Sequence, residues 1–108
     1  MTLNEFLTQL SQKPEQIEFS DTMAIIEENY TFTPSSFING DTVNEANQNN
    51  GSCKIFAFSL LNNLPTDQTL ACFGTYYRND VLKNPDGDDH QNIRNFIVSG
   101  WDGVTFST

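Results

Sequence analysis

The segment CKIFAFSLLNNL, residues 53–64, decides the fold. Its apolar residues surround most of a helical cylinder, whereas a surface helix shows a single apolar stripe. We therefore predict a central helix that begins at Ser52 and is closed by Leu64-Pro65, because proline disfavours helix in the residue before it. The other helices should pack around this one, antiparallel to their neighbours.

The chain after this segment predicts a further long helix, capped by Thr66 and continuing through DQTLACFGTYYRNDVL, residues 67–82. This helix should end before Pro85. Gly74 lies inside it and costs about 1 kcal/mol of helix stability relative to alanine. We therefore expect Gly74 to mark a close contact between helices.

The last predicted helix is capped by Asp88 and ends at Gly100, the kind of residue that adopts the left-handed conformation at helix ends. Trp101 should then fold back onto Phe96. The tail, Val104 to Phe106, alternates as a strand does. We expect it to pair with residues 32–37, which favour extended backbone.

Two helices are predicted before the central one. The first has a capping box at Thr2–Glu5 and ends near Lys13. The second is capped by Ser20 or Asp21 and runs to about Asn29. Its inner face carries three side chains, those of Met23, Ile26 and Tyr30.

Residues 41–51 are rich in asparagine and are interpreted as a loop with one helical turn around residues 43–47. The predicted fold class is therefore mainly α, with about five packed helices and at most a small two-stranded β element. A chain of 108 residues suits one hydrophobic core, so we expect a single domain over residues 1–108.

Charge excludes several classes of partner. Fourteen acidic residues against five basic ones give a net charge of −9 at pH 7, which repels nucleic acid and anionic membranes. The chain has no apolar run of about 18 residues and no Sec-type signal peptide, so we expect it in the cytosol unless a specialised secretion system exports it. We expect a monomer whose partner is a protein or a small anionic ligand.

Cys53 has the features of a nucleophile, and His90 is the candidate base. Cys53 follows Gly51-Ser52 at a predicted helix start, where the helix dipole lowers a thiol pKa. The alternative is a buried structural thiol, which we favour for Cys53 and for Cys72, a residue in mid-helix. Both should be reduced, because two cysteines do not define a disulfide framework.

Three carboxylates, those of Asp86, Asp88 and Asp89, cluster beside His90 in the run NPDGDDH. Oxygen ligands at this density suit calcium or magnesium. The alternative is a turn followed by an aspartate-capped helix, and we favour it because no glutamate closes a calcium loop. One histidine is too few for a zinc site, and no glycine-rich phosphate loop is present. We therefore expect no metal and no cofactor.

The preferred candidate site combines four side chains of the last two predicted helices, those of Tyr77, Arg78, His90 and Arg94. Arginine and tyrosine donate hydrogen bonds to anions, so this set predicts a pocket for a small anionic ligand. The structural alternative is that the two arginines pair with Asp80 or Asp89 and tie the two helices together.

Five ungapped strings, FTPSSFING, NNGSCKIFAFSLLNNL, TLACFGTYYRNDVL, PDGDDHQNIRNF and GWDGVTF, carry a resemblance to a known family. They lie within residues 17–106, and this part of the chain resembles the HopJ type III effector family. The resemblance implies an Hrp outer protein that a type III secretion system of a bacterial pathogen delivers into plant cells. It implies no catalytic residues.

One feature departs from an exported effector. Type III export usually uses a flexible, serine-rich N-terminal stretch, whereas residues 2–12 are predicted to form a capped amphipathic helix. The leading hypothesis is an effector or effector-related protein that acts by binding. A small ligand- or cation-binding module and an enzyme that uses Cys53 are the alternatives.

Overall fold

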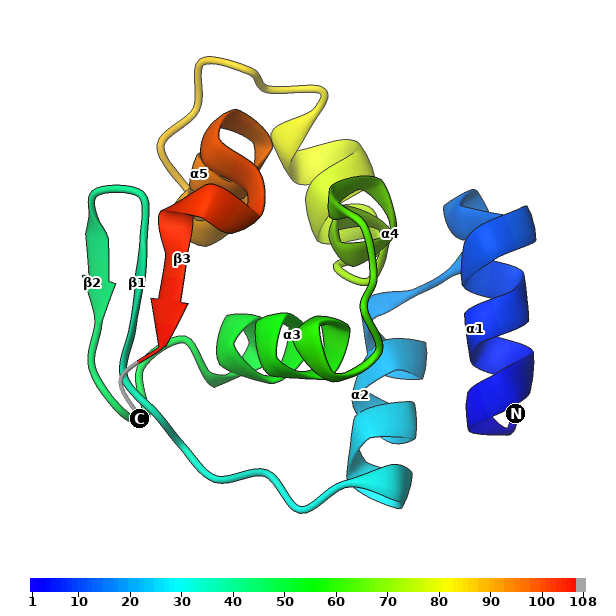
Figure 1. The fold of residues 1–108 in the computed structure, drawn as a ribbon. Helices are drawn as coiled ribbons and strands as arrows, with labels where there is room; N and C mark the ends of the chain where they lie inside the picture. Colours follow the sequence, from blue (N-terminus) through cyan, green and yellow to red (C-terminus); the bar gives the residue numbers. More distant parts are fainter. Residues whose placement is uncertain (107–108) are drawn as a thin grey trace.

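Helix α3, Asn50–Leu61, lies at the centre of the fold, between the β-sheet on one side and helices α1 and α2 on the other (Figure 1). The computed structural model describes residues 1–106. Phe56 and Phe58 of α3 are both buried. Because residues two apart on a helix point roughly 200° apart, these two rings reach opposite sides of α3.

Each of the two rings organises an aromatic cluster. The Phe56 ring centroid lies 5.0 Å from that of Phe96, 5.8 Å from that of Phe37 and 6.0 Å from that of Trp101, which joins α3 to the sheet and to α5. On the other side, the Phe58 ring lies 5.9 Å from that of Phe6 on α1. Aromatic pairs of this kind contribute about 0.5–1.5 kcal/mol each beyond the area they bury.

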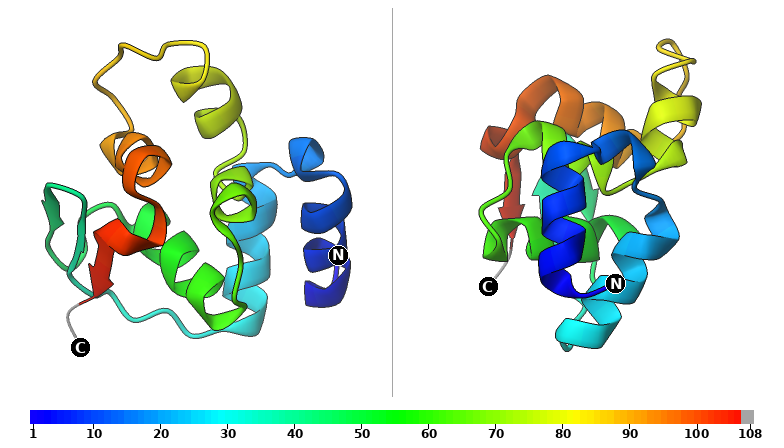
Figure 2. Two further views of the ribbon diagram at one scale, coloured as in Figure 1. Left: turned by 45° about the horizontal axis from the view of Figure 1, so that its top comes forward. Right: turned by 90° about the vertical axis from the view of Figure 1, so that its right-hand side faces the viewer.

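The prediction of a mainly α fold with about five helices is confirmed. The five α-helices of the described chain are α1 (Leu3–Gln12), α2 (Phe19–Asn29), α3, α4 (Thr66–Ala71) and α5 (Gln91–Ser99). Short 3₁₀ turns occupy Pro14–Gln16 and Gly100–Gly103. Helices α1 and α2 run antiparallel, but α3 runs across them, so the predicted antiparallel packing holds only in part (Figures 1 and 2).

The sheet has three strands where the sequence predicted two. Strands β1 (Phe37–Asn39), β2 (Thr42–Asn44) and β3 (Val104–Phe106) pair antiparallel in the order β2-β1-β3. The tail therefore pairs as predicted, although with residues 37–39 and not with 32–37. The predicted helical turn at residues 43–47 is wrong, because the turn at Gly40, with φ of +62°, folds residues 42–44 back onto β1.

The capping box of α1 is confirmed, and that of α2 lies at a different residue. The Glu5 amide donates to Thr2 Oγ1 at 3.1 Å, and the Thr2 amide donates to Glu5 Oε1 at 2.8 Å. Helix α2 is capped by Glu18, whose amide donates to Asp21 Oδ2 at 3.0 Å, and not by Ser20 or Asp21.

The long helix predicted over residues 67–82 is broken at Gly74. Helix α4 ends at Ala71, Gly74 has φ of +61°, and a π-helical segment follows over Tyr76–Val81. A Cβ atom on Gly74 would lie 2.5 Å from the Phe19 amide nitrogen. The predicted close contact at Gly74 is confirmed, but the glycine interrupts the helix to make it.

Helix α5 is capped by His90 and not by Asp88. His90 has φ of +49°, and the turn before it is closed by a hydrogen bond from the Gly87 amide to the Asn84 carbonyl at 3.0 Å. At the other end Gly100 has φ of +57° and ψ of −149°, so the predicted left-handed helical conformation is wrong, although the positive φ still requires glycine. The Trp101 ring lies edge-on to Phe96 with centroids 5.0 Å apart, as predicted.

Candidate functional site

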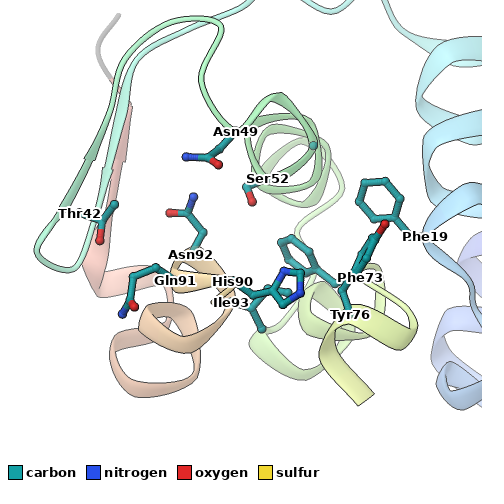
Figure 3. A pocket seen from close by; sticks show the side chains of 11 residues that line it. Phe19, Thr42, Asn49, Ser52, Phe73, Tyr76, His90, Gln91, Asn92 and Ile93 are labelled. Carbon is teal, nitrogen blue, oxygen red and sulfur yellow. The ribbon is translucent and has the colours of Figure 1, made fainter. Parts of the chain in front are cut away.

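A cavity of about 320 Å³ lies where the first turns of α3 and α5 face each other, and we call it the α3–α5 pocket (Figure 3). Figure 3 shows side chains from α2, α3 and α5, from the hairpin and from the segment after α4 around one hollow. Its lining residues are Phe19, Thr42, Asn49, Gly51, Ser52, Phe73, Tyr76, His90, Gln91, Asn92 and Ile93.

The two helices that open onto the pocket start in the same unusual way. The N-cap residues Asn49 and His90 are both in the left-handed conformation, with φ of +53° and +49°. Neither side chain accepts a hydrogen bond from its own helix. The first-turn N–H groups, which carry the positive end of the helix dipole, therefore lack a side-chain acceptor within the described structure.

Buried asparagines form one wall behind the pocket. Asn44 and Asn92 exchange hydrogen bonds of 2.9 and 3.2 Å between their amides, and Asn39 donates to the Asn92 carbonyl at 2.8 Å. Asn49 donates to Asn44 Oδ1 at 2.7 Å, which explains why its side chain is not a helix cap. This network fixes the hairpin against the starts of α3 and α5, because a buried amide without partners is costly.

Aromatic rings form the opposite wall. The rings of Phe19 and Tyr76 lie edge-on with centroids 5.1 Å apart, and Tyr76 lies 5.2 Å from His90. Phe19 fits between two glycines, because a Cβ atom on Gly51 would lie 2.9 Å from its ring and one on Gly74 would meet its backbone. The placement of this wall therefore requires both glycines.

His90 is held in a defined orientation at the rim. Its Nε2 lies 3.0 Å from Asp80 Oδ2 and 3.9 Å from Asp89 Oδ2. The Asp80 carboxylate is an acceptor, so the contact places the ring proton on Nε2 and orients the imidazole at the rim.

The structure separates the four side chains of the predicted anion site. Arg78 donates to the Ile17 carbonyl at 2.7 Å and pairs with Glu18 at 2.8 Å, which ties the π-helical segment to the start of α2. Tyr77 packs against the hydrophobic core. Of the predicted set, His90 alone lines the α3–α5 pocket.

Arg94 holds the acidic turn against α5. It pairs with Asp89 Oδ1 at 2.6 Å and donates to the Asn84 carbonyl at 2.8 Å. The predicted ion pair between Arg94 and Asp89 is therefore present, whereas Arg78 pairs with Glu18 in place of Asp80 or Asp89. The hydrogen bond from Arg94 holds the pKa of Asp89 below its usual value.

The carboxylates of the acidic turn point into solvent and do not gather into one group in the described structure. Asp86, Asp88 and Asp89 are all exposed. Within residues 1–106, no three side chains of histidine, cysteine, aspartate or glutamate lie close enough together to hold a metal ion. The turn is explained by its backbone hydrogen bond and by Arg94.

Both cysteines are buried free thiols. Cys53 lies in the first turn of α3 with Sγ 3.6 Å from the Ser35 carbonyl, and burial raises its pKa. Burial raises the pKa of Cys72 to about 12. The helix dipole at Cys53 is outweighed by the loss of water, so its thiolate is disfavoured and its surroundings are those of a structural residue.

Sequence reasoning missed most of this site. It treated residues 41–51 as a loop and did not single out Ser52, Tyr76 or Asn92 as functional. The available signals were the two Asn-Gly pairs, which lie in the hairpin turn and at the start of α3. The juxtaposition of two helix starts depends on long-range packing.

Comparison with known proteins identifies the family. The family model for HopJ type III effector protein matches residues 3–108, which is nearly the whole chain. The chain belongs to the HopJ type III effector family. No curated protein matches it.

A solved structure shares the fold. The crystal structure of a protein of unknown function, VPA0580, is 62% identical to this chain and superposes with a TM-score of 0.98. The match covers 100% of this chain and 90% of the other. The described part of this chain has no helix that is long and apolar enough to cross a membrane.

Proposed function

We propose that this HopJ-family protein acts by binding, and that the α3–α5 pocket holds a small polar molecule. The carrying observation is the pocket itself, a cavity of about 320 Å³ with aromatic rings on one side and polar groups on the other. Sites for small molecules commonly have this size and this mixture of apolar walls and few polar groups.

The walls of the pocket are built to keep their shape. The asparagine network on one side and the glycine-flanked Phe19 on the other are each fixed by contacts outside the cavity. A preformed site loses little conformational entropy when a ligand enters, which supports a binding role.

Ligand titration of the ¹⁵N-labelled chain tests this function. The probes are benzoate, phenyl phosphate, benzamide and benzyl alcohol, which share one ring and differ in the polar group. We expect at least one probe to shift the amide signals of residues 50–53 and 91–93. The function fails if no probe shifts these signals.

A matched pair of variants locates the binding. Ser52 lies in the first turn of α3 and lines the pocket, whereas Ser20 lies in the first turn of α2 and is exposed. Ser52→Leu should abolish the shifts, and Ser20→Leu should leave them intact. Equal loss in both variants would indicate that the effect does not come from the pocket.

We propose further that the protein is made in the bacterial cytoplasm and exported through a type III system to act in a host cell. The support is the family to which the chain belongs. A reporter fused to the C-terminus should reach host cells from bacteria with a working type III apparatus and not from an apparatus-deficient strain. Equal retention in both strains would instead support a role inside the bacterium.

A further inference from the structure

We propose that the molecule in the α3–α5 pocket is an aromatic anion, with a flat ring against Phe19 and Tyr76 and a carboxylate or phosphate between the first turns of α3 and α5. This inference rests on the proposed binding function and names its ligand class. It is carried by the charge of the lining, by the hydrogen-bond donors that converge there, and by the rings.

The lining of the pocket is free of acidic residues. The chain has fourteen acidic residues and five basic ones, yet none of the eleven lining residues is aspartate or glutamate. The carboxylates of Asp80 and Asp89, which do not line the pocket, interact with His90 Nε2. The lining itself therefore presents no carboxylate to an anion.

The donors come from two helices and converge on one place. Ser52 faces the cavity from α3 in Figure 3, and its hydroxyl makes no hydrogen bond within the described structure. The first-turn amides of α3 and α5 add two positive dipole ends. Hydroxyl and backbone N–H donors are groups that bind carboxylate and phosphate oxygens in proteins.

Helices α1, α2 and α4 have an acidic residue in the first turn, and α3 and α5 do not. The capping boxes of α1 and α2 supply their own carboxylates, from Glu5 and Asp21, and α4 has Asp67 in its first turn. Helices α3 and α5, of 12 and 9 residues, have neither a side-chain cap nor an acidic residue in the first turn. The first turns of these two helices both line the pocket, so one bound anion would accept hydrogen bonds from the free N–H groups of both helices.

The rings select the rest of the ligand. Phe19 and Tyr76 present ring surface beside the donors, and the buried ring of Phe73 also lines the pocket. A flat aromatic body makes offset or edge-on contacts with such rings. The two halves of the pocket thus match the two halves of an aryl carboxylate or aryl phosphate.

The same four probes test the inference separately from the binding function. We expect benzoate or phenyl phosphate to bind about tenfold or more tightly than the neutral benzamide and benzyl alcohol, with shifts at residues 50–53 and 91–93. The ratio of the two anions distinguishes a carboxylate from a phosphate ligand. If the neutral probes bind as tightly, the anion inference is overturned and the binding function stands. If no probe binds, both are overturned.

A charge-matched pair of variants gives a second readout. Ser52→Asp places a carboxylate in the uncapped first turn of α3, where it should take the place of the anion and raise the thermal midpoint. Ser52→Asn has the same size and no charge. We expect anion binding to fall about tenfold or more in Ser52→Asp and to fall much less in Ser52→Asn. Equal losses in two folded variants would contradict the inference.

Discussion

At the scale of single residues, positive backbone φ angles decide where the elements begin and end. Gly74 ends the α4 region, and the left-handed Asn49 and His90 start α3 and α5. Asparagine tolerates this conformation better than most residues do, and glycine adopts it without steric cost. A special conformation at Gly74 can be predicted from the sequence, whereas the left-handed conformations of Asn49 and His90 leave only a weak sequence signal.

Substitution of Gly74 should therefore be costly. In Gly74→Ala the new Cβ atom meets the Phe19 backbone and the residue is held at φ of +61°. We expect the free energy of unfolding to fall by about 2 kcal/mol or more, as measured by urea denaturation. The control Thr75→Ala changes an exposed neighbour and should change this free energy little. Equal midpoints for both variants would contradict the assigned contact.

The buried thiol of Cys72 predicts a loss of stability at alkaline pH. Because its pKa is raised to about 12 in the folded chain, its contribution is complete below the unfolded thiol pKa of about 8.5 and is lost as pH rises above that value. Urea midpoints from pH 7 to 10 should fall less steeply in Cys72→Ala than in the parent chain. Ser59→Ala, a buried residue that does not titrate, should leave the slope unchanged.

At the scale of elements, the sequence predicted the helices better than their junctions. Apolar periodicity and the Thr2–Glu5 capping box place α1 correctly, and the all-round apolar pattern identifies α3 as central. The sequence did not predict strand β2, because a strand of three residues, Thr42–Asn44, is too short to show an alternation of apolar and polar residues. Strand β2 pairs with β1 across the turn, and Asn44 of β2 accepts a hydrogen bond from Asn92 of α5. The conformation of β2 therefore depends on tertiary contacts.

The turn before α5 should depend on pH through Asp89. Arg94 lowers the pKa of this exposed carboxyl, so the ion pair stabilises the fold at neutral pH and is lost as pH falls through the lowered value. Between pH 7 and 3, thermal midpoints should fall less in Asp89→Asn than in the parent chain. Asp86→Asn, a change in the same turn, is the control. Parallel curves for the parent chain and Asp89→Asn would argue against this role.

At the scale of the whole molecule, α3 carries two aromatic clusters on its opposite sides. Trp101 belongs to the Phe56 cluster, and α1 belongs to the Phe58 cluster. The sequence indicated that α3 is central, but the division of its aromatic residues between two sides follows only from the packing. The pocket was unpredictable for the same reason, since its walls come from five separate parts of the chain.

Because one helix supports both clusters, the chain should unfold in one step. Phe58→Ala removes a ring on the side away from Trp101, and we expect it to lower stability by about 3–5 kcal/mol. Trp101 fluorescence and far-UV circular dichroism should report the same lowered midpoint. A fluorescence midpoint that stays at the parent value would show that the two sides unfold separately.

The order of the pocket residues along the chain has a consequence for synthesis. The cavity takes its aromatic wall from Phe19 near the beginning and its last donors from residues 90–93 near the end. A growing chain on the ribosome cannot complete the cavity until those late residues emerge, and a chain cut between Phe19 and the rest of the pocket loses part of its aromatic wall. Occupancy of the site would therefore report that the chain from Phe19 to Ile93 is made and uncut.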